Sequence, residues 1–167
     1  MTVRPIRYLG DPVLRRPAKK VSRVDDSIRR LIADMTESMY AAQGVGIAAP
    51  QIGVSLRIVV IGMPDEEPFA LINPVVVRRS GTRRLDEGCL SVPGYRGPLT
   101  RSLRVVVKAL NEEGREVRVK SEDDLLAQAL EHETDHVNGI LYVDRLDSKD
   151  DRVKLEPVAP RAQSGGE

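Results

Sequence analysis

The chain contains only two histidines, His132 and His136, and they stand four residues apart with Glu133 between them. On an α-helix this spacing places both imidazoles on one face, one turn apart. Both rings can then bind one metal ion, while Glu133, rotated by about 100° from His132, can reach a water beside that ion. Two nitrogen ligands and a nearby carboxylate suit metal-assisted hydrolysis. The segment therefore predicts a helix that carries a metal centre.

The alternative is a solvent-exposed helix face on which these residues are merely polar. Four apolar residues precede the motif and indicate that the helix packs inside the protein: Leu125, Leu126, Ala129 and Leu130. Burying two histidines without partners is costly, because each ring loses its hydration. Metal binding is therefore the favoured interpretation.

A catalytic metal site usually has three protein ligands and one open position. One class of metalloprotease has a third histidine six residues after the second, but this position holds Tyr142. A downstream carboxylate, Glu156, lies in a segment that predicts no helix. The single cysteine, Cys89, follows Gly88, which permits close backbone approach. A lone cysteine is more often a small buried hydrophobic residue, so both interpretations of Cys89 stay open on this ground alone.

An amphipathic helix is predicted after the proline-punctuated lead-in of residues 1–24. The residues from Asp25 to Ser27 form a helix start, and Gly44 and Gly46 end the pattern. Between these signals, apolar residues recur at helical spacing: Ile28, Leu31, Ile32, Met35 and Met39. We expect these side chains, methionines included, to pack in the core.

The rest of the chain predicts strands and the histidine-bearing helix. Runs rich in β-branched residues predict strands at 57–61, 69–73 and 74–77, and a β-hairpin formed by 103–110 and 115–120. A capping pattern at Ser121–Asp124 starts the second helix, which should run to about Asn138 and stop at Gly139. We therefore predict an α+β fold with mainly antiparallel β-sheets around a central metal-binding helix, and a second, N-terminal amphipathic helix. One domain over residues 1–146 and a polar, flexible tail over 147–167 are expected.

Charge and hydropathy exclude several classes of protein. Lys and Arg number 26 against 25 for Asp and Glu, and a net charge of +1 gives no overall case for a nucleic-acid patch or a membrane surface. No apolar run can span a bilayer, and the N-terminus lacks the apolar core of a secretory signal. A single cysteine excludes an internal disulfide and fits the reducing cytoplasm. We expect a cytoplasmic protein and, without an evident association motif, a monomer.

Three motifs resemble the signature motifs of the peptide deformylase family, in the family's order and at its usual intervals: GVGIAAPQ at 44–51, EGCLS at 87–91 and HETDH at 132–136. The segment from Gly10 to Arg15 is also similar to the start of the family, so the likeness covers roughly residues 5–146. One departure is Glu131, where the family usually has glutamine. We expect this change to leave the metal ligands intact and to alter the electrostatics beside the metal.

The resemblance implies hydrolysis of the N-formyl group from the N-terminal formyl-methionine of newly made polypeptides, with release of formate. It implies that Cys89, His132 and His136 hold one divalent metal ion, physiologically Fe(II), with Zn, Ni or Co as substitutes. It also implies that Glu133 is the general base toward water and then the acid that protonates the departing amine.

The resemblance further implies how substrate is bound. The side-chain amide of Gln51 and the backbone N–H of Leu90 would donate to the oxyanion that forms on the formyl carbon. Val45 and Gly46 would pair with the substrate backbone as an added strand, and Gly88 would face it from the other side.

Two further features concern the helix that carries the histidines. Val45 and Ala129 are the candidate residues for an apolar slot that holds the methionine side chain. Leu125 lies one turn before Ala129 and extends the same face of the helix. Asp135 and Arg101 resemble a family pair that steadies this helix, and a solvated surface ion pair is the alternative.

Two other functions stay open at this point. One is a zinc peptidase acting on unformylated peptides. The other is a metal-stabilised or ribosome-associated binding module without turnover, against which Glu133 and Gln51 argue, since a structural metal site needs neither. Many bacterial relatives end in a long basic helix that docks on the ribosome. The short, mixed-charge segment from Asp147 predicts at most a transient ribosome contact.

Overall fold

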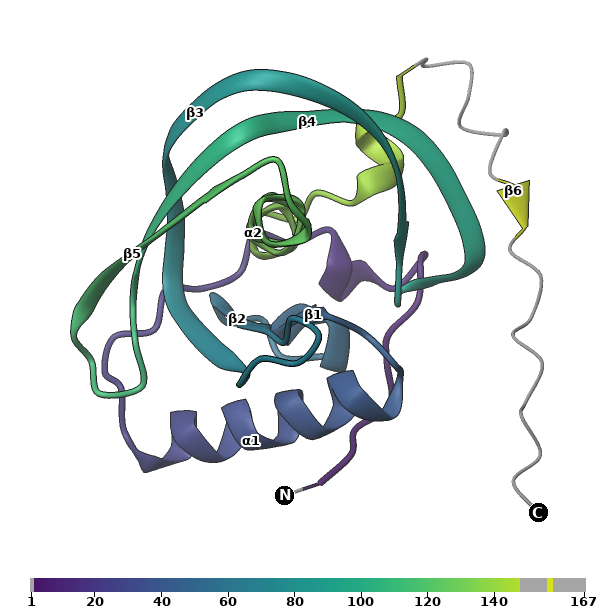
Figure 1. The fold of residues 1–167 in the computed structure, drawn as a ribbon. Helices are drawn as coiled ribbons and strands as arrows, with labels where there is room; N and C mark the ends of the chain where they lie inside the picture. Colours follow the sequence, from purple (N-terminus) through teal and green to yellow (C-terminus); the bar gives the residue numbers. More distant parts are fainter. Residues whose placement is uncertain (1, 148–155, 158–167) are drawn as a thin grey trace.

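The computed structural model describes residues 2–147 and the backbone of 156–157 (Figure 1). Its elements, in chain order, are η1 (Pro12–Leu14), α1 (Asp26–Ala41), β1 (Gly46–Ala48), η2 (Ala49–Ile52), β2 (Ile58–Ile61), β3 (Phe69–Cys89), β4 (Val92–Leu110), β5 (Glu116–Glu122), α2 (Leu125–Val137), η3 (Tyr142–Arg145) and β6 (Glu156–Pro157). Strands β1 to β5 form one antiparallel sheet in sequence order. The predicted α+β class is therefore confirmed. The predicted tail over 147–167 lies outside the described residues, apart from Asp147 and β6.

Helix α1 starts as its sequence predicts. The carboxylate of Asp25 accepts a hydrogen bond from the backbone N–H of Ile28 at 3.1 Å, which satisfies one of the free donors of the first turn. All five side chains of the predicted stripe are buried: Ile28, Leu31, Ile32, Met35 and Met39. They pack with residues of β1 and β2 in one core cluster, so α1 covers that end of the sheet (Figure 1).

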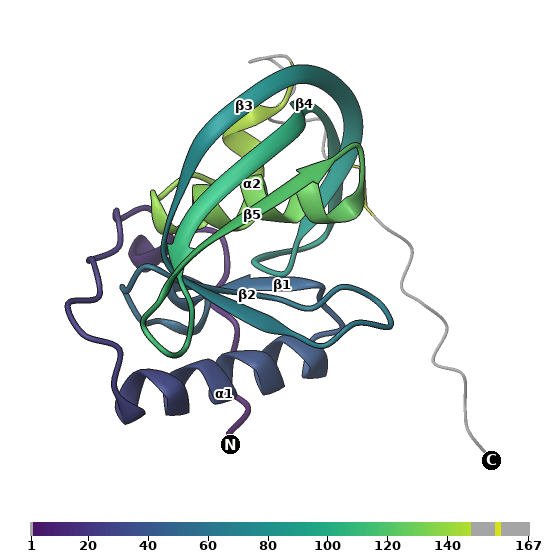
Figure 2. The same cartoon turned by 60° about the vertical axis from the view of Figure 1, so that its left-hand side comes forward.

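Helix α2 lies inside the protein. Its N-cap, Asp124, accepts a hydrogen bond from the backbone N–H of Ala127 at 2.8 Å. Every residue from Ala129 to Val137 is buried. Figure 1 looks along this helix and shows β3, β4 and β5 curving around it, and Figure 2 shows the same strands from the side. The helix packs against Val105 and Val107 of β4, so it must carry its polar residues in a dry environment.

The long ribbon of β3 and β4 is the main difference from the predicted strands. The predicted break before Pro74 is a register shift between Ile72 and Val75 within one continuous strand. Residues 78–89 and 92–102 were not predicted as strands, although they form most of this ribbon. Their sequence is rich in arginine and glycine and lacks apolar alternation, because both faces of much of the ribbon are exposed or half-buried. The hairpin of 103–110 with 115–120 is confirmed as the pairing of β4 with β5.

None of the helices within residues 2–147 is both long enough and apolar enough to cross a membrane.

Replacing Gly139 by alanine should destabilise the protein. Gly139 follows α2 at a φ of +77°, and a Cβ there would lie 2.6 Å from the backbone oxygen of Arg15. Left-handed strain and this backbone clash together should lower the free energy of unfolding by about 2 kcal/mol or more, measured by urea denaturation. Gly114→Ala is the matched control, because its φ is +76° but its Cβ would come only within 3.8 Å of Val24. Equal losses in both variants would contradict the prediction.

Candidate active site

The three predicted metal ligands come together from two elements. Helix α2 carries His132 and His136, and Cys89 is the last residue of β3. The Sγ of Cys89 lies 3.2 Å from the Nε2 of His136, which in turn lies 3.2 Å from the Nε2 of His132. These ligand atoms all lie within 4.8 Å of one another.

This donor set fits a transition-metal ion. Lone pairs that face one another at 3.2 Å in a buried site repel unless a proton or a cation lies between them. Burial is the largest cause that lowers the pKa of His136, and it keeps this ring neutral and able to bind a metal. One thiolate and two imidazoles form a ligand set that suits zinc, iron, cobalt and nickel.

Glu133 lies beside the ligands with its carboxyl group buried. Its Oε1 is 3.9 Å from the Nε2 of His132, and its Oε2 has no hydrogen-bond partner among the described residues. Burial raises the pKa of Glu133 to about 7, because the charged carboxylate loses its hydration. A carboxyl group that titrates near neutrality can both accept and return a proton.

Gln51 points its amide nitrogen into the site. Its Oε1 accepts a hydrogen bond from the backbone N–H of Ala48 at 2.9 Å, which fixes the orientation of the amide group. The Nε2 donates to the Oγ of Ser91 at 3.1 Å and lies 3.6 Å from the Sγ of Cys89. In the chain, Leu90 lies between Cys89 and Ser91, and like Gln51 it lines the adjoining cavity. Gln51 and Leu90 therefore both lie at the wall of the cavity that Cys89 and His132 also line.

A buried network of charges supports His132 from behind. Glu87 is hydrogen-bonded to the Nδ1 of His132 and accepts two hydrogen bonds from Arg101, at 2.6 and 2.9 Å. Arg101 also donates to Asp135 at 2.8 Å, and Arg145 donates to Asp135 at 2.6 Å. The side chains of Arg101 and Asp135 are only 2% and 6% exposed, so the alternative of a solvated surface pair is wrong.

The protonation state of Glu87 follows from its neighbours. Burial alone would raise its pKa, but the hydrogen bonds from His132 and Arg101 outweigh burial and hold the pKa of Glu87 at about 2. Glu87 is therefore a carboxylate that binds Nδ1 and leaves Nε2 of His132 turned toward the other two ligands.

Glu131 faces away from the ligands. Its carboxylate accepts hydrogen bonds from the backbone N–H and the Oγ of Ser102, at 2.7 and 3.1 Å, and from the Nε of Arg79 at 3.1 Å. The extra negative charge thus has its own cation on β3. These contacts attach α2 to the ribbon of β3 and β4.

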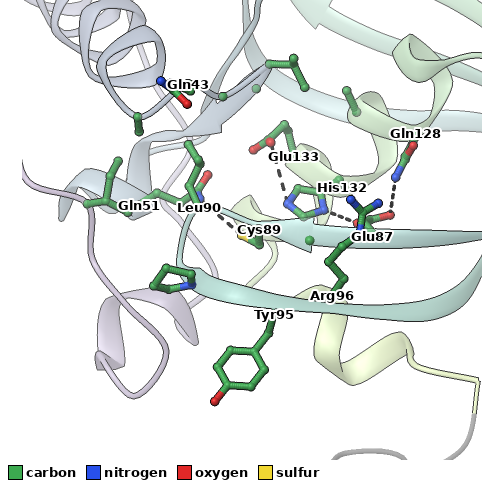
Figure 3. Close-up of a pocket in the computed structure, with 18 of the residues that line it drawn as sticks. Gln43, Gln51, Glu87, Cys89, Leu90, Tyr95, Arg96, Gln128, His132 and Glu133 are labelled. Atoms are coloured by element: carbon green, nitrogen blue, oxygen red, sulfur yellow. Dashed lines mark hydrogen bonds and ion pairs between the residues drawn. The ribbon is translucent and has the colours of Figure 1, made fainter. Parts of the chain in front are cut away.

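The site opens into a cavity of about 730 Å³ (Figure 3). The predicted substrate contacts all line it: Val45, Gly46, Gly88 and Ala129. Gly46 lets the backbone of β1 lie close to Glu133, because a Cβ at this position would lie 2.7 Å from the Oε1 of Glu133. Sequence reasoning missed Gln128 and Arg96, which also line this cavity. Helical spacing could have found Gln128, since it lies one turn before His132.

Sequence reasoning also missed the connection that Glu87 makes. Its position two residues before Cys89 placed it in a recognised motif, but its bond to His132 joins residues 45 apart in the chain. No local pattern reports such a contact.

A half-buried thiol and two buried imidazoles beside a carboxyl group, at the wall of a cavity, suit a metal-dependent hydrolase. The sequence profile of the family described as polypeptide deformylase matches residues 3–152. A peptide deformylase of Dehalococcoides mccartyi (strain CBDB1) is 51% identical over 158 residues, which cover 94% of each chain. A peptide deformylase of Acetivibrio thermocellus is 51% identical over 146 residues, covering 87% of this chain and 85% of the relative.

Solved structures agree with these sequence relatives. The crystal structure of a peptide deformylase from Legionella pneumophila has a TM-score of 0.87 and 46% identity, covering 92% of this chain and 90% of that one. A peptide deformylase from Synechococcus elongatus, solved in complex with actinonin, has a TM-score of 0.85 and 43% identity, covering 89% and 81%. The chain belongs to the peptide deformylase family. It is a hydrolase that removes the N-formyl group from the terminal methionine of new polypeptides, which leaves neither the peptidase nor the binding-module alternative with support.

Replacing Arg101 by leucine should destabilise the protein strongly. Two buried carboxylates, Glu87 and Asp135, would lose the cation they share, and breaking a buried ion pair in this way typically costs about 3–5 kcal/mol. The matched control is Arg104→Leu on the same strand, whose pair with Glu122 is exposed and should be worth less than about 1 kcal/mol. Denaturant unfolding of both variants measures the difference. Similar losses for Arg101→Leu and Arg104→Leu would refute the role assigned to the buried network.

Proposed function

We propose that Cys89, His132 and His136 hold one divalent metal ion and that deformylation takes place beside it. One observation carries this proposal: the ligand atoms of the three residues lie within 4.8 Å of one another, and Cys89 and His132 line the cavity. A divalent ion held there supplies a Lewis acid that activates water and polarises a carbonyl group. The donor set suits Fe(II), Zn, Ni and Co, and the family resemblance favours Fe(II) as the native ion.

Glu133 is the proton carrier in this proposal. It takes a proton from the attacking water and later gives it to the amine nitrogen that departs from the formyl carbon. The support is its position at the cavity wall, its burial and its pKa raised to about 7, which makes both transfers accessible near neutral pH.

Gln51 and Leu90 stabilise the negative charge that develops on the formyl oxygen. Such donors lower the barrier only if they are already oriented when the charge forms. The amide of Gln51 meets this condition, because its oxygen is held by the backbone N–H of Ala48 and its nitrogen faces the ligands. Leu90 contributes its backbone N–H from the turn after Cys89.

The substrate backbone adds as a strand beside Val45 and Gly46, with Gly88 on the opposite wall. β1 supports this proposal, because among the described strands it pairs only with β2 and ends the sheet on that side, at the cavity wall. The side chain of the first residue then enters a slot lined by Val45 and Ala129 and extended by Leu125.

We also propose that residues 1–146 form the catalytic unit, which works as a cytoplasmic monomer on formylated nascent peptides and contacts the ribosome transiently. The substrate class supports this setting, since nascent peptides are still on the ribosome. Sedimentation velocity over a range of protein concentrations tests the monomer. Ribosome co-sedimentation as strong as that of a relative with a long basic C-terminal helix would contradict the transient contact.

Changing Glu133 to glutamine should abolish formate release while the metal stays bound. The assay uses a formyl-methionyl tripeptide and protein purified without oxygen and loaded with Fe(II). Glutamine keeps the shape of the side chain but cannot accept the proton, so kcat should fall by about a hundredfold or more. Glu131→Gln is the matched control on the same helix, and its activity should stay within about threefold, because Glu131 bonds to Ser102 and Arg79 instead.

Metal content separates the two parts of this proposal. Cys89→Ser should lose most of its metal by elemental analysis, whereas Glu133→Gln should retain about one ion per chain. Full activity of Glu133→Gln would disprove the proton-transfer role, and full metal occupancy of Cys89→Ser would disprove the ligand set.

A further inference from the structure

One face of α2 forms a wall of the cavity. Its lining residues recur at helical spacing: Leu125, Gln128, Ala129, His132 and Glu133. Leu125 and Ala129 are apolar and suit the slot for the first side chain of the substrate. Gln128 stands between them, half-buried and uncharged, one helical turn or about 6 Å along the axis from His132. An amide group therefore interrupts a wall that is otherwise apolar up to the ligands.

The amide of Gln128 is held in place. Its Nε2 donates to the Oε2 of Glu87 at 3.3 Å. Glu87 cannot turn away, because Arg101 binds both of its oxygens, at 2.6 and 2.9 Å, and both side chains are buried. Figure 3 shows the nitrogen of Gln128 turned toward Glu87 and the oxygen on the far side.

The rest of this amide is available to a ligand. The bond to Glu87 is the one side-chain hydrogen bond of Gln128 among the described residues, so the second N–H and the oxygen are without a protein partner there. When a substrate fills the cavity, it displaces the water around this amide. The amide then either bonds to the substrate or stays without a partner, which costs free energy. A first residue with a polar atom near the end of its side chain can supply that partner.

We propose that Gln128 is a specificity-determining residue that lets the enzyme deformylate peptides whose first residue is methionine sulfoxide, in addition to methionine. The thioether of methionine is a weak acceptor, and the aliphatic chain of norleucine has none. A sulfoxide oxygen is a strong acceptor and can receive the free N–H of Gln128. This inference rests on the proposed function, because it assumes that the first side chain lies against this wall of α2.

The test compares three formyl tripeptides that differ only in the first residue: methionine, norleucine and methionine sulfoxide. The Fe(II)-loaded wild type and Gln128→Leu are assayed for kcat/KM on each. The kcat/KM for the sulfoxide peptide, divided by the kcat/KM for the norleucine peptide, should fall about tenfold in Gln128→Leu, as expected for one lost hydrogen bond. Any effect of the lost bond to Glu87 on His132 acts on all three peptides alike and cancels in this ratio.

Gln43→Leu is the matched control. Gln43 lines the same cavity from the segment between α1 and β1 and makes no bond to Glu87, so its variant should keep the wild-type ratio. Gln128→Met, which keeps the length of the side chain, replaces Gln128→Leu if the latter does not fold by circular dichroism. Calorimetric binding of the deformylated product peptides gives a second readout: the sulfoxide product should bind about tenfold more weakly to the Gln128 variant.

The outcomes distinguish this inference from the function on which it rests. A wild-type protein that releases no formate from the formyl-methionine peptide would refute the proposed function. A wild type that is active on that peptide, with the same sulfoxide-to-norleucine ratio in Gln128→Leu, would overturn the specificity role of Gln128 alone.

Discussion

Arg101 lies between two carboxylates, those of Glu87 on β3 and Asp135 on α2, and all three side chains are buried. A protein interior does not solvate ions, so each buried charge needs a partner with good geometry. Arg101 serves both carboxylates at once and joins β3, β4 and α2 in doing so. Without this cation Glu87 would lose two hydrogen bonds and one of the charges that, together with His132, keep its pKa low, and the bond that orients the His132 ring would be weakened.

The ribbon of β3 and β4 reconciles two opposing demands. The helix that carries the histidines must be buried to hold them rigidly, yet the reacting centre must reach a peptide from outside. The ribbon curves around α2 and ends at Cys89, so the third donor arrives from the strand that covers the helix (Figure 2). The opposite wall is the short edge strand β1, and the cavity opens between the two.

The sequence predicts best where structure is set within a few residues. The cap Asp25 and the apolar stripe of α1 are local signals, and α1 begins where they indicate. The other helix, α2, begins at Leu125, directly after the predicted capping segment Ser121–Asp124. The ribbon escaped prediction because its exposed residues, such as Arg84 and Asp86, carry no apolar alternation. Its strand character comes from pairing between β3 and β4 along their length.

The candidate site divides in the same way. Spacing alone places His132, Glu133 and His136 together on one helix. Cys89 could be either a metal ligand or a small buried hydrophobic residue, and only the family motifs favour the ligand. The contacts of Glu87 and Gln128 join α2 to the end of β3, and no periodicity within either segment encodes them. Polar residues of a buried site are positioned by distant partners, and such partners leave little trace in a local pattern.

The lack of a side chain at Gly46 restricts how a protein of this kind can escape an inhibitor that lies along the β1 edge. A common route to drug resistance is a larger residue that fills the space the compound occupies. At this position a single added carbon would lie 2.7 Å from the carboxyl oxygen of Glu133. A residue that shut out such an inhibitor would therefore also displace the carboxyl group of Glu133, so this steric route would cost the group that we propose carries the proton.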